Sequence, residues 1–431
     1  MTNLNFFSKK GFQKIVLTFS VGVSLTLLLL NNSDISRMQA SDSDSFFAAF
    51  SHFQKLGYYD GCVAGYGLLY NSFLTLFFNL THSYEQSFFL VNLLSQLAIL
   101  IILIKTLFFY INKIDRFYFF GIAILVTTQV ANLKAYSVAY NDTFLAVFVA
   151  SIIYVLITKI FFDFENKMNF IALGALLALA LSIRETTAII ILCIFLMIIL
   201  LKFTQKIVWQ LVFKNITYMT IVFLFVTVLL HFPSLKENKK LCFYDKNPKT
   251  GAVWIQRNYL GLKKIQNHVV LPIHRDAIWI NTRFEEVNTY LKTNGEKSLP
   301  KNIFEVILKD PLLLAQIFVY NFGYLLLISV RFYGLLLFSM LFLFLRKSVV
   351  KTHNLMLIFT IALYILLSFI CVTFVETRWL TGYEFLIPAS TFMFYKSISS
   401  NHNKNSANLV LMVSLIMVSG FNLLSINKLI N

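Results

Sequence analysis

Long apolar runs separated by short polar segments repeat along most of this chain. A helix needs about 20 apolar residues to cross a hydrocarbon core roughly 30 Å thick. Only helices and closed barrels satisfy every backbone polar group in lipid. The pattern therefore predicts an all-α polytopic membrane protein with about 11 transmembrane helices, in a range of about 10 to 13. The runs lie at 15–30, 87–110, 117–132, 143–160, 168–183, 186–203, 214–232, 326–345, 354–375, 382–397 and 407–427.

Two shorter apolar stretches have two interpretations each. Residues 66–80 are flanked by Gly65, Gly67 and Asn79, which favours a helix on the membrane surface, although a span stays open. Residues 311–325 leave the same choice. After Asp44, the aromatic run Phe46 to Phe50 predicts an amphipathic helix on the bilayer surface. The helix after Asp44 and the predicted surface helix at 66–80 both belong to the first external loop.

The longest polar stretch, 233–310, predicts a small extracytoplasmic domain with an amphipathic helix near 276–293. The chain is therefore expected to have three parts. They are an N-terminal transmembrane module over 1–232, which contains the first external loop at 31–86, an extracytoplasmic loop or cap over 233–310, and a C-terminal transmembrane module over 311–431.

The placement of lysine and arginine predicts the orientation. With the N-terminus in the cytoplasm, the inside loops collect most of these residues, as the positive-inside rule requires. Treating 66–80 as a span, with no other change, would invert every later loop. In the preferred orientation, with 66–80 on the membrane surface, the inside loops hold Lys9, Lys10, Lys14, Lys113, Arg116, Lys159, Lys167, Lys202, Lys206, Lys214, Arg346, Lys347, Lys351, Lys396 and Lys404.

Composition supports this class. The chain has 431 residues, of which 58% are hydrophobic and 13% charged, whereas soluble domains carry about 25% charged residues. The net charge of +17 would suggest nucleic acid binding in a soluble protein. Here the positive-inside rule explains it, and no nucleic acid partner is expected. The four cysteines, Cys62, Cys193, Cys242 and Cys371, show no metal-type spacing, although Cys62 and Cys242 could share one compartment.

Unusual polar residues gather on the predicted external face. Asp42 and Asp44 follow the first span, where carboxylates are candidates for a general base or for ligands of a divalent metal. Solvated turns and helix N-caps are the structural alternatives for them. Asp142 starts a span directly, so it too fits an N-cap.

Two arginines on this face could bind phosphate, because the guanidinium group donates paired hydrogen bonds. Arg184 adjoins Glu185 between two apolar runs, and mutual neutralisation of this pair is the alternative. Arg378 follows Glu376 and precedes Trp379, which also fits a membrane-boundary anchor. Lys134 would add to the same positive field.

Four short segments resemble the GT-C superfamily of membrane glycosyltransferases. In particular, they resemble enzymes of the dolichyl-phosphate-mannose–protein mannosyltransferase and aminoarabinose-transferase type. The segments are the acid pair followed by Ser45-Phe46-Phe47 and later by Gly65-Tyr66-Gly67-Leu68-Leu69-Tyr70, then Tyr140-Asn141-Asp142, the helix start at Asp310-Pro311, and Glu376-Thr377-Arg378-Trp379-Leu380 before Pro388. The acidic dipeptide common in the first loop of relatives is absent, as is a proline in the Gly65–Tyr70 region.

The resemblance implies a sugar donor carried on polyprenyl phosphate and used on the extracytoplasmic side. A glycan, lipid or protein would be the acceptor. Asp44, and after it Asp42, would be the catalytic base or bind a divalent metal, whose requirement stays open. Arg378, with Arg184 and Lys134, would bind the donor phosphate, and Asp142, Glu376, Glu185 and Tyr66 would support the site.

The resemblance also implies an integral, multi-pass protein of the bacterial plasma (inner) membrane, in contact with the lipid bilayer. Two other functions stay open. A polysaccharide polymerase or ligase also uses lipid-linked donors. A flippase or exporter of lipid-linked saccharide would need a polar path through the membrane, and the predicted spans contain few ionisable residues.

Overall fold

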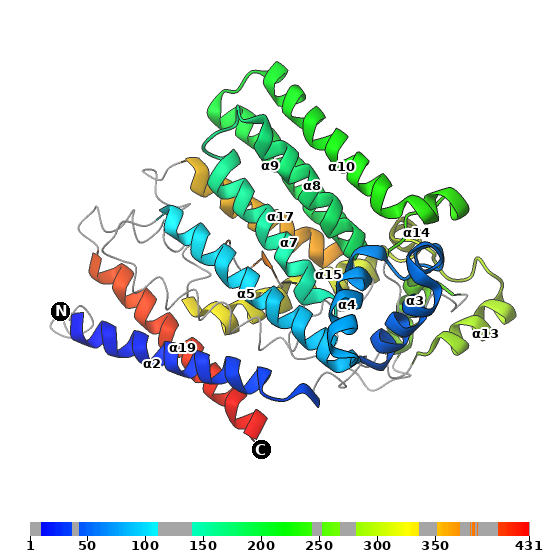
Figure 1. The fold of residues 1–431 in the computed structure, drawn as a ribbon, viewed down its shortest axis with the longest axis horizontal. Coiled ribbons are helices and arrows are strands. Elements are labelled where there is room, and N and C mark those ends of the chain that lie inside the picture. The colour runs from blue at the N-terminus through cyan, green and yellow to red at the C-terminus, as the bar shows by residue number, and fades with distance from the viewer. Residues whose placement is uncertain are drawn as a thin grey trace. The chain divides into compact units, whose positions relative to one another are not determined.

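The computed structural model describes residues 10–36, 43–110, 140–243, 252–267, 282–335, 351–370, 380, 382–383, 386 and 404–430. Every regular element in these ranges is helical (Figure 1). The elements are α2 (Lys10–Asn32), α3 (Ser43–Val63), α4 (Leu68–Thr81), α5 (Tyr84–Tyr110), α7 (Asp142–Val155), η3 (Leu156–Ile160), α8 (Lys167–Ile183), η4 (Glu185–Thr187), α9 (Ala188–Gln205), α10 (Trp209–Asn238), α11 (Trp254–Gln266), α13 (Phe284–Asn294), α14 (Ile303–Lys309), α15 (Pro311–Tyr333), α17 (Lys351–Ile370) and α19 (Lys404–Ile430).

Seven helices in the described part of the chain are long and apolar enough to cross a membrane. The prediction of an all-α membrane protein is therefore confirmed, while the predicted number of spans is not. The predicted runs 168–183 and 354–375 correspond to the shorter apolar helices α8 and α17. The runs 117–132 and 382–397 lie wholly or mostly outside the described residues. The seven candidates are Gly11–Asn32, Tyr84–Thr106, Asp142–Ile160, Glu185–Gln205, Trp209–Asn238, Pro311–Arg331 and Leu409–Asn427.

One helix resolves an ambiguity in the sequence. α15 is continuous over Pro311–Tyr333, so the stretch 311–325 belongs to a candidate span and not to a separate surface helix. Local chemistry explains its start. Asp310 Oδ1 accepts a hydrogen bond from Leu313 N at 3.2 Å, and proline suits the first helical position because its missing N–H would have no helical partner there.

The chain divides into two compact units. Unit 1 contains 1–246, 329–360 and 377–431, and unit 2 contains 247–328 and 361–376. In unit 1, α8 packs between α7 and α10, and α7 also packs against α5 (Figure 1). Gly174 of α8 lies so close to α10 that a Cβ atom there would meet Met219 O at 2.3 Å. Small residues of this kind let transmembrane helices approach closely.

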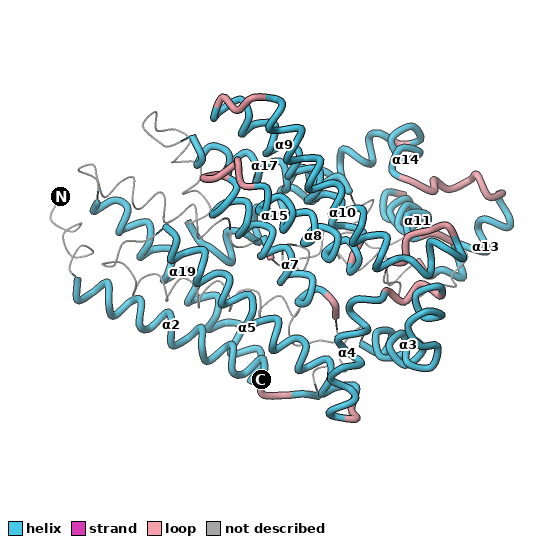
Figure 2. The backbone as a smooth tube through the Cα atoms, turned by 45° about the horizontal axis from the view of Figure 1, so that its top comes forward, coloured by secondary structure: helices cyan, strands magenta, loops and turns pink. Residues whose placement is uncertain are grey.

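A second helix pair in unit 1 joins the two ends of the chain. α2 and α19 run side by side in both ribbon and tube views (Figures 1 and 2). Ser419 Oγ donates to Ser20 Oγ at 2.8 Å, and Asn422 Nδ2 donates to Ser24 Oγ at 3.2 Å. Such polar side chains stabilise helix pairs in an apolar surrounding.

The first loop folds as two helices, α3 and α4, as expected from its apolar pattern. Gly57 interrupts α3 with a φ of 76°, a value that non-glycine residues rarely adopt. Gly67, at a φ of 68°, precedes α4. Phe46, Phe50, Tyr70 and Phe88 belong to one buried aromatic cluster, so these helices pack on the start of α5.

Unit 2 has its own core, built from α11, α13, α14 and the first turns of α15. Tyr259, Leu262, Val287, Val306 and Leu313 are among its buried members. The predicted amphipathic helix near 276–293 corresponds in part to α13, which begins at Phe284, while 268–281 lie outside the described residues.

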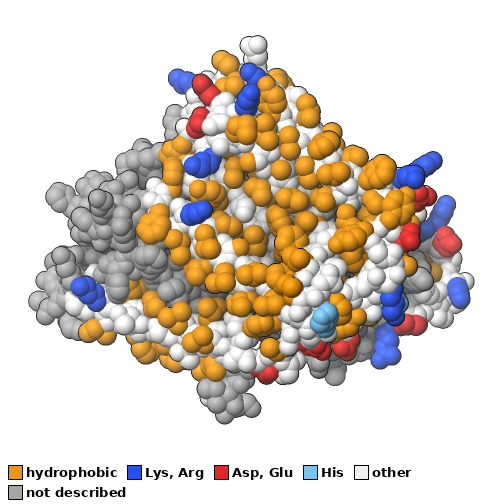
Figure 3. Space-filling model, viewed as in Figure 1, with side chains coloured by type: hydrophobic (Ala, Val, Ile, Leu, Met, Phe, Trp, Pro, Cys, Tyr) orange, Lys and Arg blue, Asp and Glu red, His pale blue; other side chains and the backbone are white. Residues whose placement is uncertain are grey.

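Many large apolar side chains are exposed on the surface of the protein. Hydrophobic side chains cover most of the face drawn in Figure 3. On α10, Phe213, Phe225 and Leu229 are each more than half exposed. A monomeric soluble protein rarely shows apolar patches of this extent, whereas a helix in contact with lipid does.

Candidate functional site

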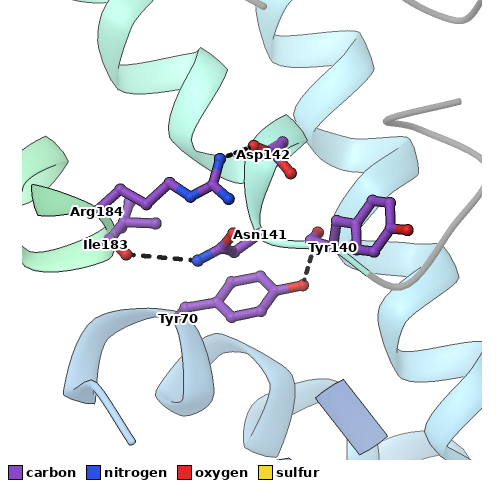
Figure 4. Close-up of polar contacts among 6 residues, drawn as sticks. All are labelled: Tyr70, Tyr140, Asn141, Asp142, Ile183 and Arg184. Carbon is purple, nitrogen blue, oxygen red and sulfur yellow. Dashed lines mark hydrogen bonds and ion pairs between the residues drawn. The ribbon is translucent and has the colours of Figure 1, made fainter. Parts of the chain in front are cut away.

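A buried ion pair joins the start of α7 to the end of α8 (Figure 4). Arg184 Nη1 donates to Asp142 Oδ1. The Asp142 side chain is 2% exposed and that of Arg184 23%. A carboxylate with so little access to water is costly unless a cation and hydrogen bonds compensate for its lost hydration. The pair therefore fixes the two helix ends to one another.

The backbone around Arg184 explains how it reaches α7. α8 ends at Ile183, and Arg184 is extended, with φ −150° and ψ 133°. The short helix η4 follows, and Thr187 Oγ1 donates to Ala180 O at 3.1 Å, which holds this turn on α8. Glu185 is exposed. Arg184 thus pairs with Asp142, which lies 42 residues earlier in the sequence, instead of being neutralised by its neighbour.

The two residues before Asp142 are also bonded across helices. Asn141 Nδ2 donates to Ile183 O at 3.4 Å, and Tyr70 Oη donates to Tyr140 O at 3.0 Å (Figure 4). Asn141 is the N-cap of α7, but its side chain makes no capping bond. Three consecutive residues therefore bind to α4 and to the end of α8, and this tripeptide acts as the junction of three helices.

The start of α3, which carries Asp44, contacts the same junction. Asp44 lies in the first turn of α3 and is exposed. Two residues later, the Phe46 ring contacts the Tyr140 ring edge-on, with centroids 5.3 Å apart. Because Tyr140 directly precedes the Asn141-Asp142 pair, the fold brings the acidic start of α3 and the charged start of α7 to one end of the helices.

Tyr66 lies in the turn between α3 and α4. Its ring stacks on that of His52, with centroids 6.0 Å apart, and packs with Ala49 and Phe53. The buried side chain of Asn71 donates to Tyr66 O. These contacts hold α4 against α3, so the structure shows for Tyr66 a role in positioning the loop.

The other predicted residues, Asp42, Lys134, Glu376 and Arg378, lie outside the described residues. A described neighbour in the sequence, Gly382, packs on α7. Its φ is +93°, and a Cβ atom there would lie 2.9 Å from Val149 Cβ and 3.1 Å from Ala146 O. The chain that follows the predicted arginine motif is therefore within two helical turns of Asp142.

Sequence reasoning named most of these residues but missed their connections. Tyr70 was expected only as part of a resembling segment, and its bond to a backbone carbonyl has no sequence signal. The described residues contain no cluster of three or more His, Cys, Asp or Glu side chains that could hold a metal ion. Because Asp42 is not among them, metal binding by Asp42 and Asp44 stays a prediction.

Comparisons with protein families, curated proteins and solved structures find no match for this chain. The bond to Asp142 uses one of the five N–H donors of Arg184. Because the side chain is 23% exposed, its other N–H groups can donate hydrogen bonds to an anion. Asp44 places an exposed carboxylate at the same end of the helices.

Proposed function

We propose that this protein is a membrane glycosyltransferase of the GT-C type. It would move a sugar from a polyprenyl-phosphate donor to a glycan, lipid or protein acceptor on the extracytoplasmic side of a bacterial plasma membrane. The observation that carries the proposal is the junction at the start of α7. There a partly exposed arginine, held by a buried aspartate, and an exposed first-loop acid share one end of the helix bundle.

The proposed reaction forms a bond between the acceptor oxygen and the anomeric carbon of the sugar while the bond from that carbon to the phosphate oxygen breaks. Negative charge then grows on the leaving phosphate. Arg184, held in place by Asp142, would stabilise this charge without rearranging, which is the most effective use of a fixed cation. Arg378 and Lys134 would add to the same field, and Glu376 would orient Arg378.

The acceptor hydroxyl must also lose a proton. Asp44 would accept it, because its carboxylate is exposed at the start of α3, where an acceptor can approach. Asp42 is the second candidate. Attack from the side opposite the phosphate would invert the anomeric centre. Glu185, exposed beside Arg184, would contact the acceptor or donor sugar. A divalent metal bound by Asp42 and Asp44 could supply part of the charge stabilisation.

Arg378 belongs to this proposal because it lies only four residues before Gly382 in the sequence. Gly382, which packs on α7, follows it by four residues, and four residues span at most about 14 Å. The donor's polyprenyl tail would lie against the exposed apolar sides of the helices, in contact with the bilayer. The N-terminus would then be cytoplasmic, as the distribution of basic residues indicates.

The proposal is tested in a strain of the source organism that lacks the gene. Mass spectrometry of its lipids should show accumulation of a polyprenyl-phosphate sugar, and its surface glycans or lipids should lack one sugar. Asp44→Asn and Arg184→Ala should reproduce this phenotype, whereas Glu286→Gln in unit 2 should restore the wild type. Full complementation by both Asp44→Asn and Asp42→Asn would refute the assigned base.

The same strain separates the alternatives. If the protein is a polymerase or ligase, the strain that lacks it should show a changed length or attachment of a whole polysaccharide, and not the loss of one sugar. If the protein is a flippase or exporter, the strain that lacks it should keep the lipid-linked saccharide in the cytoplasmic leaflet. An added glycosidase cannot reach it there in intact spheroplasts. Reporter fusions after residue 60 and after residue 381 should report the same compartment, and opposite compartments would exclude a shared site.

A further inference from the structure

Two buried thiols lie together at the point where the first loop meets the end of α10. Cys62, near the end of α3, is 0% exposed, and Cys242, four residues after α10, is 2% exposed. Each thiol shifts the pKa of the other, so the two groups are close neighbours. The two residues are far apart in the sequence, so the fold and not local geometry brings them together.

Other bonds show that this meeting is a built contact. Gly67 N donates to Cys242 Sγ at 3.3 Å, and Cys242 N donates to His231 Nδ1 at 3.0 Å. Cys62 Sγ lies 4.0 Å from Leu230 O. Each sulfur is therefore held by backbone groups of the other segment or of α10. A cysteine that merely filled a gap in the core would need none of these bonds.

The segments on either side are also joined. Asn238 Nδ2 donates to Val63 O at 2.8 Å, and Tyr59 Oη donates to Glu237 Oε1 at 2.6 Å. The last turn of α3 is therefore attached to the last turn of α10. α10 has 30 residues, which makes it about 45 Å long at about 1.5 Å per residue. The hydrocarbon core is roughly 30 Å thick, so α10 is longer than the core is thick. The thiol pair lies beside Leu230 and His231, about 32 Å along α10 from Trp209 at about 1.5 Å per residue, which is near the edge of that core.

We propose that Cys62 and Cys242 form a disulfide bond in the mature protein and so fix the first loop to the end of α10. The bond would close a loop that contains α4, α5 and α7–α10, with the junction at Asp142 inside it. The proposal does not depend on the glycosyltransferase assignment. It depends on both segments facing an oxidising compartment, in which disulfides form and persist.

The oxidant would be a disulfide-containing thiol oxidase or oxidoreductase, acting on the assembled thiol pair when the end of α3 opens locally. The Cys62 thiolate attacks one sulfur of the oxidant disulfide, which forms a mixed disulfide and releases one oxidant thiolate. The Cys242 thiolate then attacks Cys62 Sγ, forms the new S–S bond and releases the second oxidant thiolate. Two electrons and two protons pass to the oxidant, which becomes a dithiol.

The surroundings favour Cys62 as the first nucleophile. The hydrogen bond from the Cys242 thiol lowers the pKa of Cys62 to about 7, whereas the same hydrogen bond and burial raise the pKa of Cys242. A thiol with a pKa near the ambient pH is the most effective attacking group. Once formed, the bond would be buried and therefore protected from reductants.

The test uses the full chain in membranes that are precipitated with acid at harvest, so that no thiol exchanges. The denatured protein is labelled with a maleimide polymer before and after reduction. We expect two of the four cysteines to label without reduction and all four after it. A peptide pair that joins Cys62 to Cys242 should appear in the non-reduced digest and disappear on reduction. Labelling of all four thiols without reduction would overturn the proposal.

Matched variants keep the result interpretable. Cys193→Ala should leave the difference at two labels, because Cys193 is buried separately within α9. Cys62→Ser and Cys242→Ser should each abolish the difference, and the double variant Cys62→Ser/Cys242→Ser should fold with a lower melting temperature than wild type. A difference of two labels that survives in Cys62→Ser would assign the bond to other cysteines and would also refute the proposal.

Discussion

Each unit of this protein contains an aspartate at the start of an apolar helix that pairs with a cation from another helix, yet the two pairs are built differently. In unit 1, Asp142 of α7 pairs with Arg184. In unit 2, Asp310, which precedes α15, pairs with Lys263 of α11. The side chains of the first pair are 2% and 23% exposed for the acid and the cation, and those of the second 13% and 33%.

The difference shows what each pair does. Asp310 also accepts from Leu313 N at 3.2 Å, so it works as a helix cap that a flexible, hydrated lysine neutralises. Asp142 is held with Asn141 in a junction of three helices, and its partner is a rigid guanidinium with donors to spare. A buried pair gains little net stability because desolvation offsets attraction. Its place at this junction is consistent with the proposed use of Arg184.

The largest expected effect comes from removing one acid of each pair. Asp142→Asn should destabilise the protein by about 3–5 kcal/mol, because a mostly buried guanidinium loses its counter-charge. Asp310→Asn should cost less than about 1 kcal/mol, since asparagine caps a helix as well as aspartate and Lys263 can turn to water. Thermal unfolding of the purified proteins in one detergent measures both. Equal losses would mean that burial does not distinguish the pairs.

Exchanging the cations should separate stability from activity. Arg184→Lys keeps the charge but loses the planar fork, so we expect a stability loss of only about 1 kcal/mol. The transfer of sugar should nevertheless fall by at least about tenfold, because bidentate phosphate recognition is lost. Lys263→Arg should change neither quantity. Product formation by membranes from complemented strains, normalised to protein amount, gives the comparison. Full activity of Arg184→Lys would remove Arg184 from the phosphate site.

The polar frame around Asp142 predicts a smaller effect. Tyr70→Phe removes the hydrogen bond from Tyr70 Oη to Tyr140 O, at a cost of about 0.5–1.5 kcal/mol. Tyr259→Phe in the core of unit 2 is the control, because Tyr259 contributes mainly its ring there. Melting temperatures in detergent should fall for the first variant and hold for the second. A reversed order would mean that the hydroxyl of Tyr70 is not needed at the junction.

Local signals in the sequence predicted local structure well. Asp310-Pro311 predicts a helix start because a cap and a proline act within one turn, and α15 begins there. The amphipathic first loop is likewise helical. Spans were harder to place: the predicted run 326–345 begins inside α15, which ends at Tyr333, and 336–345 lie outside the described residues. Hydropathy is a sum over a window, so it marks where a helix lies better than where it ends.

The site was predictable as a set of residues and not as an arrangement. Asp142 and Arg184 each had a plausible local partner, a free helix amide for one and Glu185 for the other. The fold chose a partner 42 residues away. Nothing in the periodicity of α7 and α8 specifies which of their charged ends meet, because that depends on how the helices pack. The same limit explains why a shared compartment for Cys62 and Cys242 was foreseeable but their contact was not.

The smallest expected loss of stability comes from the most exposed of the three acids, Glu286. Lys264 and Glu286 also form an ion pair, and here the acid is 43% exposed and the lysine 22%. Glu286→Gln should change stability by no more than about 0.5 kcal/mol, because water solvates the separated charges nearly as well as they solvate each other. Added salt should reduce even this difference, since mobile ions screen exposed charges.

Measured together, the three acid-to-amide substitutions should rank Asp142 above Asp310 and Asp310 above Glu286. Unfolding of all three in the same detergent, at low and high salt, gives that ranking. If Glu286→Gln costs as much as Asp142→Asn, the loss at Asp142 cannot be ascribed to a desolvated arginine. The argument that this arginine is held ready for an anionic substrate would then lose its physical basis, because a cation that water can easily satisfy needs no such support.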